Sequence, residues 1–128
     1  MDEQQITETL ATKVHGWRVQ EFGAEDQIAW VSGERCLQCW VKNYMPTEND
    51  SQAINTANAW LARLDKNVET GYWGLSRGTG DEKAYAEIIV AEKDKTERVY
   101  LGEHESEAMA LCIAMAKALE GEVHESVH

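Results

Sequence analysis

The chain has 128 residues, of which 23 are acidic and 12 are basic, so its formal net charge is −11. This length fits one domain with a hydrophobic core of its own. A surface this negative repels phosphate, which argues against binding to nucleic acid through a basic patch and favours a basic protein partner.

The first ten residues, MDEQQITETL, have neither a basic start nor an apolar run, which predicts that the chain has no signal peptide. The longest apolar stretch, residues 108–116, is too short to span a bilayer. We therefore expect a cytoplasmic protein that makes no membrane contact. In that reducing compartment its three cysteines are expected to be free thiols.

The N-terminal part is predicted to be a helix over residues 3–15. Ile6, Leu10 and Val14 recur every four residues, and Gly16 follows where a helix would end. Short strand-like segments separated by turns come next, and they predict an antiparallel meander. These segments are residues 17–22, 28–31 and 35–42.

A loop over residues 43–50 contains the single proline, Pro46, and leads into a second helix. Asp50 or Ser51 is expected to cap that helix, which continues to Asp65 with apolar residues at three- and four-residue spacing. The remaining segments repeat the earlier order. They are a strand-like run over 68–75 with its strand near 72–76, strands over 85–92 and 97–101, a helix over 106–120, and a frayed tail over 122–128.

The element order α-βββ-α-βββ-α predicts an α+β fold with mostly antiparallel strands in one domain, residues 1–121. Three segments also carry a resemblance: ITETLATKVHGW, the loop NYMPTEND before INTANAWLARL, and the closing EAMALCIAMAKAL. In this order and spacing, from Ile6 to about Leu119, they resemble the phage ABA sandwich domain family of phage and prophage genomes. The sequence GEHESEA departs from the family, where a more aromatic lead-in is expected.

The resemblance implies a phage-encoded origin and a three-layer α/β/α sandwich. The family's role is uncharacterised, so the resemblance supplies no catalytic residue to carry over.

Cys36 and Cys39 form a CxxC, the spacing of many zinc and redox sites. They lie within a predicted strand, where residues three apart point to opposite faces, and no second CxxC follows. We expect structural cysteines, with metal or redox use as the alternative.

The histidines give only weak indications of a metal site or an acid–base group. His124 and His128 are four apart and could share a helix face as metal ligands, but they sit in the tail. His104 lies between two glutamates, where a solvated segment before a helix is expected rather than an acid–base group. The segment Arg77–Gly80, RGTG, lacks the GK[ST] ending of a phosphate loop and predicts a hairpin turn.

No Ser–His–Asp order, paired-acid motif or HExxH occurs in the sequence. We predict a protein that is not an enzyme and has no metal or cofactor.

Five tryptophans and four tyrosines stand beside a single phenylalanine. Trp and Tyr are common where a surface is half wet, so rings on one sheet face would form a stacking platform for a planar ligand or a partner's side chains. The alternative is that a helix covers this face and the rings are core. The candidate ligand-binding residues are Trp40, Trp73, Tyr85, Tyr100, Lys42, Arg77 and Arg98, while Trp17, Trp30 and Trp60 are expected to be core anchors.

Two functions are expected ahead of the others. The first is a phage accessory protein that sequesters a small host signalling ligand, such as a nucleotide signal used in antiviral defence. The second is an acidic inhibitor that covers a basic site on a host protein, which the net charge favours. A structural or assembly role is a further alternative, and the oligomeric state is left open.

Overall fold

A computed structural model of the chain describes residues 2–23, 27–33, 36–64, 68–77, 80, 82–94, 96–120 and 124–126. The helices are α1 (Glu3–Thr9), continued by a π-helical turn η1 (Leu10–Val14), α2 (Asp50–Ala62) and α3 (Glu107–Glu120), with a short 3-10 turn η2 (Val41–Asn43). The strands are β1 (Arg18–Glu21), β2 (Ile28–Ser32), β3 (Cys36–Trp40), β4 (Val68–Ser76), β5 (Ala84–Glu92), β6 (Glu97–His104) and β7 (His124–Ser126). The predicted α+β class and the order α-βββ-α-βββ-α are confirmed.

The helices begin at capping residues that the sequence supplies. Asp2 accepts a hydrogen bond from the Gln5 backbone N–H, and the Gln5 side chain accepts one from the Asp2 N–H, which together form a capping box. Asn49 caps α2, so the cap lies one residue before Asp50, the earlier of the two expected caps. Gly16 has a φ of 70°, a conformation that favours glycine and stops the first helix where predicted.

Two antiparallel sheets form, with strand orders β1-β2-β3 and β4-β5-β6-β7. Antiparallel pairing within each meander is thus confirmed. The prediction of a frayed tail is wrong for residues 124–126, because these residues pair with β6 as strand β7.

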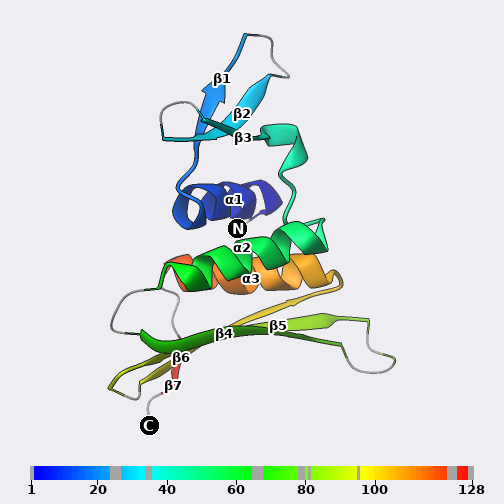
Figure 1. Cartoon of the computed structure of the whole chain (residues 1–128). Coiled ribbons are helices and arrows are strands. Elements are labelled where there is room, and N and C mark those ends of the chain that lie inside the picture. Colours follow the sequence, from blue (N-terminus) through cyan, green and yellow to red (C-terminus); the bar gives the residue numbers. More distant parts are fainter. Residues whose placement is uncertain are drawn as a thin grey trace.

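The helices lie between the two sheets (Figure 1), with α1 next to the small sheet and with α2 and α3 next to the large one. The layers are therefore stacked sheet–helices–sheet, whereas the resemblance implied a sheet between two layers of helices. The physical reason is α3, which is apolar nearly all round and buries eight of its residues. A helix of this kind needs packing partners on several sides and takes the central layer.

The central helix approaches the large sheet most closely at Gly102 of β6. A Cβ atom added at Gly102 would overlap the Ala110 carbonyl oxygen and lie 2.9 Å from the Ala114 nitrogen. The neighbouring helix-facing positions of the sheet include Ala86, Ile88 and Tyr100, all buried against this helix layer. A residue without a side chain at position 102 is what allows this close packing.

None of the helices within the described ranges has the length and apolar content needed to cross a membrane.

The close approach gives a stability prediction. Gly102→Ala is expected to lower the free energy of unfolding by about 3 kcal/mol, because the added methyl group meets backbone atoms that cannot move aside cheaply. Gly74→Ala on β4 is the matched control, since its Cβ would lie 3.5 Å from the flexible Glu87 side chain. Urea unfolding should show this control unchanged or up to about 1 kcal/mol more stable. Equal effects of both substitutions would contradict the packing described.

Candidate functional site

The four aromatic residues predicted to share one face do not do so. Trp40 belongs to the small sheet, where its ring lies 6.0 Å from that of Phe22. Trp73 and Tyr100 both lie on the helix-facing side of the large sheet, opposite Ile88 in the register. Only Tyr85 lies on the outer side, and it is 43% exposed. The single stacking platform is therefore wrong, because strand alternation and the division into two sheets separate the rings.

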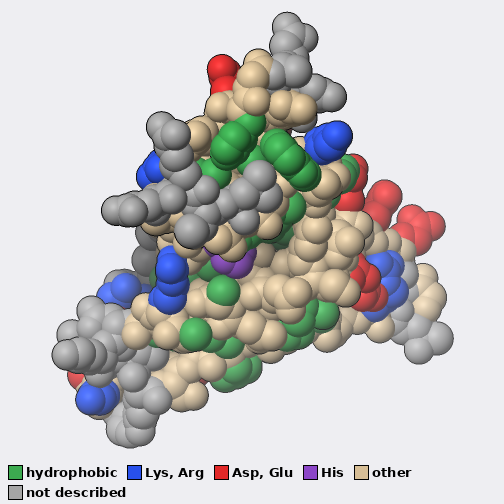
Figure 2. All heavy atoms as spheres, turned by 45° about the horizontal axis from the view of Figure 1, so that its top comes forward, with side chains coloured by type: hydrophobic (Ala, Val, Ile, Leu, Met, Phe, Trp, Pro, Cys, Tyr) green, Lys and Arg blue, Asp and Glu red, His purple; other side chains and the backbone are tan. Residues whose placement is uncertain are grey.

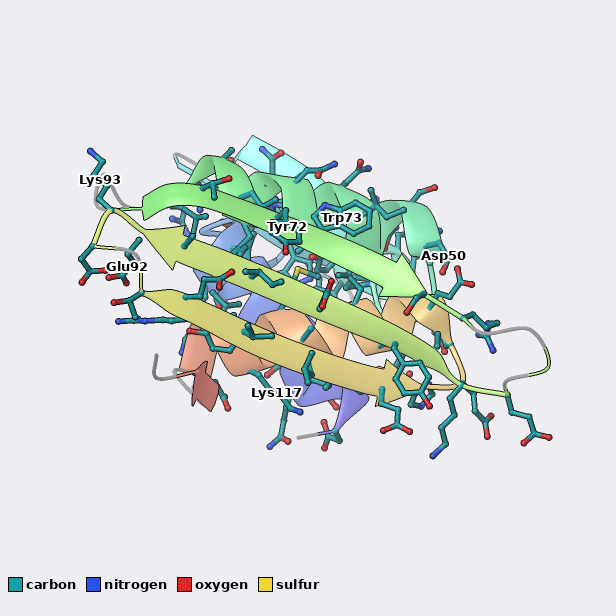
Figure 3. The ribbon with its side chains drawn as sticks, turned by 90° about the horizontal axis from the view of Figure 1, so that it is seen from below. Asp50, Tyr72, Trp73, Glu92, Lys93 and Lys117 are labelled. Carbon is teal, nitrogen blue, oxygen red and sulfur yellow. The ribbon has the colours of Figure 1, made fainter. Side chains whose placement is uncertain are left out.

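The two helix-facing rings, Trp73 and Tyr100, pack against the helices as part of the core, which was the alternative to a stacking platform. Trp73 is half-buried and donates from its indole nitrogen to Asn58 of α2 at 2.9 Å, and its ring lies beside that helix in Figure 3. Tyr100 is 5% exposed and belongs to the core.

The three predicted cationic residues also lie apart. Lys42 is exposed on η2, next to the small sheet. Arg77 follows β4 and pairs with Glu107, and Arg98 on β6 pairs with Glu92. No cluster of these cations faces an aromatic surface among the described residues, so the geometry required for an anionic planar ligand is not formed by this set.

The CxxC, histidine and RGTG motifs lie partly outside the described residues. The β2–β3 register shifts opposite Trp30 and Val31, so simple alternation does not describe the segment between Cys36 and Cys39. The side chain of Cys36 lies outside the described residues. Cys39 is a free thiol whose pKa is raised by burial.

His124 lies in a strand and not on a helix face, while His128, Gly78 and Thr79 are outside the described residues. Among the described residues, no group of three or more His, Cys, Asp or Glu side chains could hold a metal ion.

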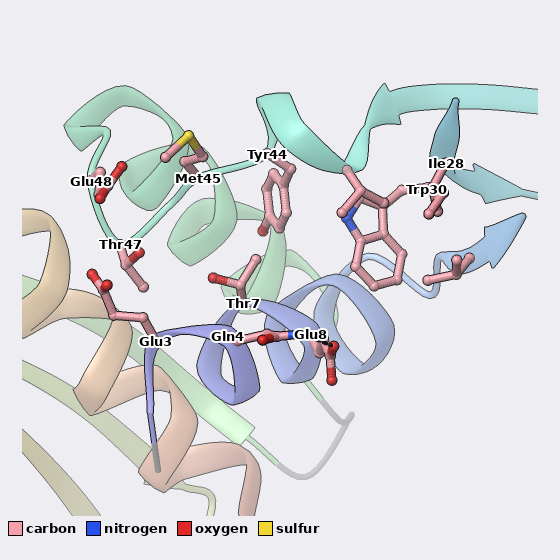
Figure 4. Close-up of a pocket in the computed structure, with 12 residues that line it drawn as sticks. Glu3, Gln4, Thr7, Glu8, Ile28, Trp30, Tyr44, Met45, Thr47 and Glu48 are labelled. Atoms are coloured by element: carbon pink, nitrogen blue, oxygen red, sulfur yellow. Dashed lines mark hydrogen bonds between the residues drawn. The ribbon is translucent and has the colours of Figure 1, made fainter. Parts of the chain in front are cut away.

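A groove of about 420 Å³ lies between α1, the small sheet and the segment after η2. We call it the α1 groove (Figure 4). Helix α1 supplies one wall, strands β1 and β2 supply another, and residues 44–48 close the third side. The lining residues are Glu3, Gln4, Thr7, Glu8, Val19, Ile28, Trp30, Val41, Tyr44, Met45, Thr47 and Glu48.

The floor of the α1 groove is aromatic and apolar. Trp30 and Tyr44 are 3% and 5% exposed and pack together with Ala11. Among the described residues the buried indole nitrogen of Trp30 has no hydrogen-bond partner, and in Figure 4 it lies on the side of the ring that faces Tyr44. Most buried polar groups find a partner, so this N–H is an unsatisfied donor beneath the floor, which an acceptor can reach only where the side chains that cover it move aside.

The rim adds exposed apolar groups and negative charge. Val19 is 52% exposed and Met45 is 42% exposed. In Figure 4, Glu3 and Glu48 lie at the same end of the groove, and Glu8 lies further along α1. No Lys or Arg is among the described residues that line the groove, so the charged groups along its rim are carboxylates. In Figure 2, exposed hydrophobic side chains gather on the small-sheet part of the molecule.

A hydrogen-bonded cluster behind the groove fixes the position of Tyr44. The Tyr44 hydroxyl lies 2.9 Å from Oγ1 of Thr56 on α2, and Nε2 of His15 lies 3.2 Å from the same oxygen. The His15 ring stacks on Trp17 at a centroid distance of 4.2 Å, and both rings meet Tyr44 edge-on. Thr56 is 1% exposed, whereas His15 and Trp17 are half-buried, so the cluster packs behind Tyr44 and supports the groove.

Burial shifts the pKa values of two groups in the cluster, Tyr44 and His15. It raises the pKa of Tyr44 to about 12, so the hydroxyl stays neutral and keeps its hydrogen bond. Burial also lowers the pKa of His15, and the nearby positive charge of Arg63 lowers it further. The Arg63 guanidinium donates to the backbone carbonyl of Val14, which holds the end of α2 against the residues before His15.

Sequence reasoning missed most of this groove. Trp30 was expected to be a core anchor, and it is buried, but nothing in the pattern shows that its N–H lacks a partner. Tyr44 was placed in a loop. A usable signal was the acidic N-terminal helix, in which Glu3, Glu8 and their neighbours leave only one apolar stripe.

Comparison with models of known protein families, with curated proteins and with solved structures gave no match. The resemblance to the phage ABA sandwich family therefore stays a prediction.

The His15 cluster predicts a pH dependence of stability. Because the pKa of His15 in the folded protein lies below its ordinary value of 6.5, the unfolded chain binds the proton more readily. Stability is then fully present above about pH 6.5 and is lost as the pH falls from there towards the lowered pKa. Urea unfolding between about pH 7 and pH 5 should show a steeper loss for the unmodified chain than for His15→Gln. Identical profiles would contradict the assignment.

Proposed function

We propose that the chain is a non-enzymatic binding module whose α1 groove takes a basic, partly apolar segment of a partner protein. The observation that carries this proposal is the combination of an apolar aromatic floor with three rim carboxylates and no cation among the described lining residues. A lysine-rich segment with interspersed leucine-like residues matches both features. The apolar side chains would cover Val19 and Met45, and the ammonium groups would lie near Glu3, Glu8 and Glu48.

The unpaired Trp30 N–H supports a peptide as the occupant. A peptide backbone presents carbonyl oxygens. Once the side chains that cover the buried indole nitrogen move aside, one carbonyl placed over the floor would accept the hydrogen bond that Trp30 lacks among the described residues. The charge adds to this in two ways: the overall −11 speeds the encounter with a basic partner, and the rim carboxylates orient it.

The setting that we propose follows from the resemblance. For a phage-encoded protein, the partner would be a host protein in the bacterial cytoplasm, and covering its basic site would be an inhibitory or anti-defence role. A small anionic signal is less well supported as the ligand, because the candidate rings and cations are dispersed and the α1 groove is acidic.

The test uses a fluorescent hexapeptide, Lys-Leu-Leu-Lys-Leu-Leu with blocked ends, and fluorescence anisotropy. Binding is expected at about 50 mM salt and should weaken at about 300 mM, since screening reduces the rim attraction. Replacing both lysines of the peptide by Nε-acetyl-lysine should weaken binding strongly, because its length and apolar content stay the same while its charge is lost.

The protein variant for this test is Glu3→Gln with Glu48→Gln, expected to weaken binding by roughly tenfold. The matched control is Glu82→Gln with Glu105→Gln, two exposed residues outside the groove that give the same change in net charge. Equal loss in the two double variants would mean that only net charge matters, and the proposed groove would be rejected. Equal affinity for the acetylated peptide would reject the basic occupant.

A further inference from the structure

The large sheet has an outer face that no described part of the chain covers. Figure 3 shows this face, with the helices behind the sheet and Tyr72 on strand β4. Three of the exposed large hydrophobic residues lie on it: Tyr72 is 48% exposed, Tyr85 is 43% exposed and Leu101 is 51% exposed. It is separated from the α1 groove by the helix layer, so it is a second and independent surface (Figure 1).

A hollow of about 190 Å³ lies in this face at Gly74. The register places Gly74, Glu87 and Leu101 in one row across β4, β5 and β6. Tyr72 and Tyr85 occupy the rows on either side. Because Gly74 has no side chain, the Glu87 side chain leans over it, and a Cβ at position 74 would lie 3.5 Å from the Glu87 carboxylate. The Glu87 carboxylate, Tyr85 and Leu101 are therefore among the groups that line the hollow.

The carboxylate in this hollow differs from its neighbours in the sheet. Glu92 pairs with Arg98 at 3.3 Å, and Glu103 pairs with Lys83 at 3.1 Å. Glu87 is half-buried, and among the described residues no cation pairs with it. A half-buried carboxylate without a cation, set between exposed aromatic rings, is a site that attracts a cation.

We infer that the Gly74 hollow is a second docking site, which takes an arginine side chain presented by a partner protein. Arginine fits better than lysine, because its planar guanidinium stacks on a tyrosine ring and donates two parallel hydrogen bonds to a carboxylate. The apolar residues beside that arginine would cover Leu101 and Tyr72. A second copy of the chain does not fit, since stacking two such faces would bring Glu87, Glu97 and Glu103 of both copies together.

With the α1 groove on the other side of the helix layer, the chain is a two-sided adaptor that holds two basic segments at once. The adaptor role rests on both sites, but the Gly74 hollow itself does not depend on the proposed groove, because the two surfaces share no residue.

The probe for the hollow is the blocked tripeptide Leu-Arg-Leu, titrated into ¹⁵N-labelled protein and followed by NMR. Amide shifts should concentrate at Gly74, Tyr85, Glu87 and Leu101. The tripeptide with citrulline in place of arginine, which has the same shape without the charge, should give much smaller shifts. Glu87→Gln and Gly74→Val should each weaken binding by about tenfold, the first by removing the charge and the second by filling the hollow.

The controls are Glu103→Gln and Thr70→Val, two residues on the same face that do not line the hollow. Both should bind the tripeptide as the unmodified chain does. Gly74→Val is expected to fold, because valine favours strands and the space above Gly74 is occupied only by a flexible side chain. Equal shifts with citrulline, or undiminished binding by Gly74→Val, would overturn the inference. Binding lost only in the Glu3→Gln/Glu48→Gln variant would also overturn it, while leaving the α1 groove supported.

Discussion

The burial of α3 in the central layer is the constraint on which the rest of the structure depends. Eight of its residues are buried, it packs on β5 and β6, and α1, η1 and α2 contact its other sides. Gly102 is what permits the sheet to lie this close. Because α1, α2 and α3 lie between the sheets, no helix formed by the described residues covers the outer side of either sheet.

Both candidate surfaces follow from that arrangement. The large sheet keeps an outer face with exposed tyrosines, and Gly74 opens a hollow in it. The small sheet meets the helix layer mainly through Trp30, Tyr44 and Ala11, and the space left beside this contact is the α1 groove. The cluster of His15, Thr56 and Tyr44 ties that contact to α2, so the groove has a rigid floor although its rim is open.

Much of the fold could be predicted from the sequence, because each helix and strand has its own periodicity and caps. The side of β4 that faces the helices could not be predicted in this way. Tyr72 and Trp73 are adjacent aromatic residues, and alternation places one inside and one outside without saying which. Contacts made by α2 decide it, with Asn58 binding Trp73.

The stacking of the layers was equally out of reach from local patterns, since an apolar stripe shows that a face is buried but not by which element. The unpaired Trp30 N–H depends on where every neighbouring acceptor lies, and no spacing in the sequence encodes that. The acidic character of the site, in contrast, was visible in the composition. The prediction of a single aromatic platform, however, named residues that do not line the α1 groove.

The central claim is that the α1 groove binds a peptide whose backbone satisfies Trp30, and the indole N–H signals test it most directly. The five tryptophan indoles give separate signals in a ¹H–¹⁵N spectrum, and Trp30→Phe identifies the one from Trp30. When the lysine–leucine hexapeptide is added, the Trp30 signal should move downfield and shift more than the other four, because its proton gains an acceptor. A Trp30 signal that stays in place while the peptide binds would contradict the account.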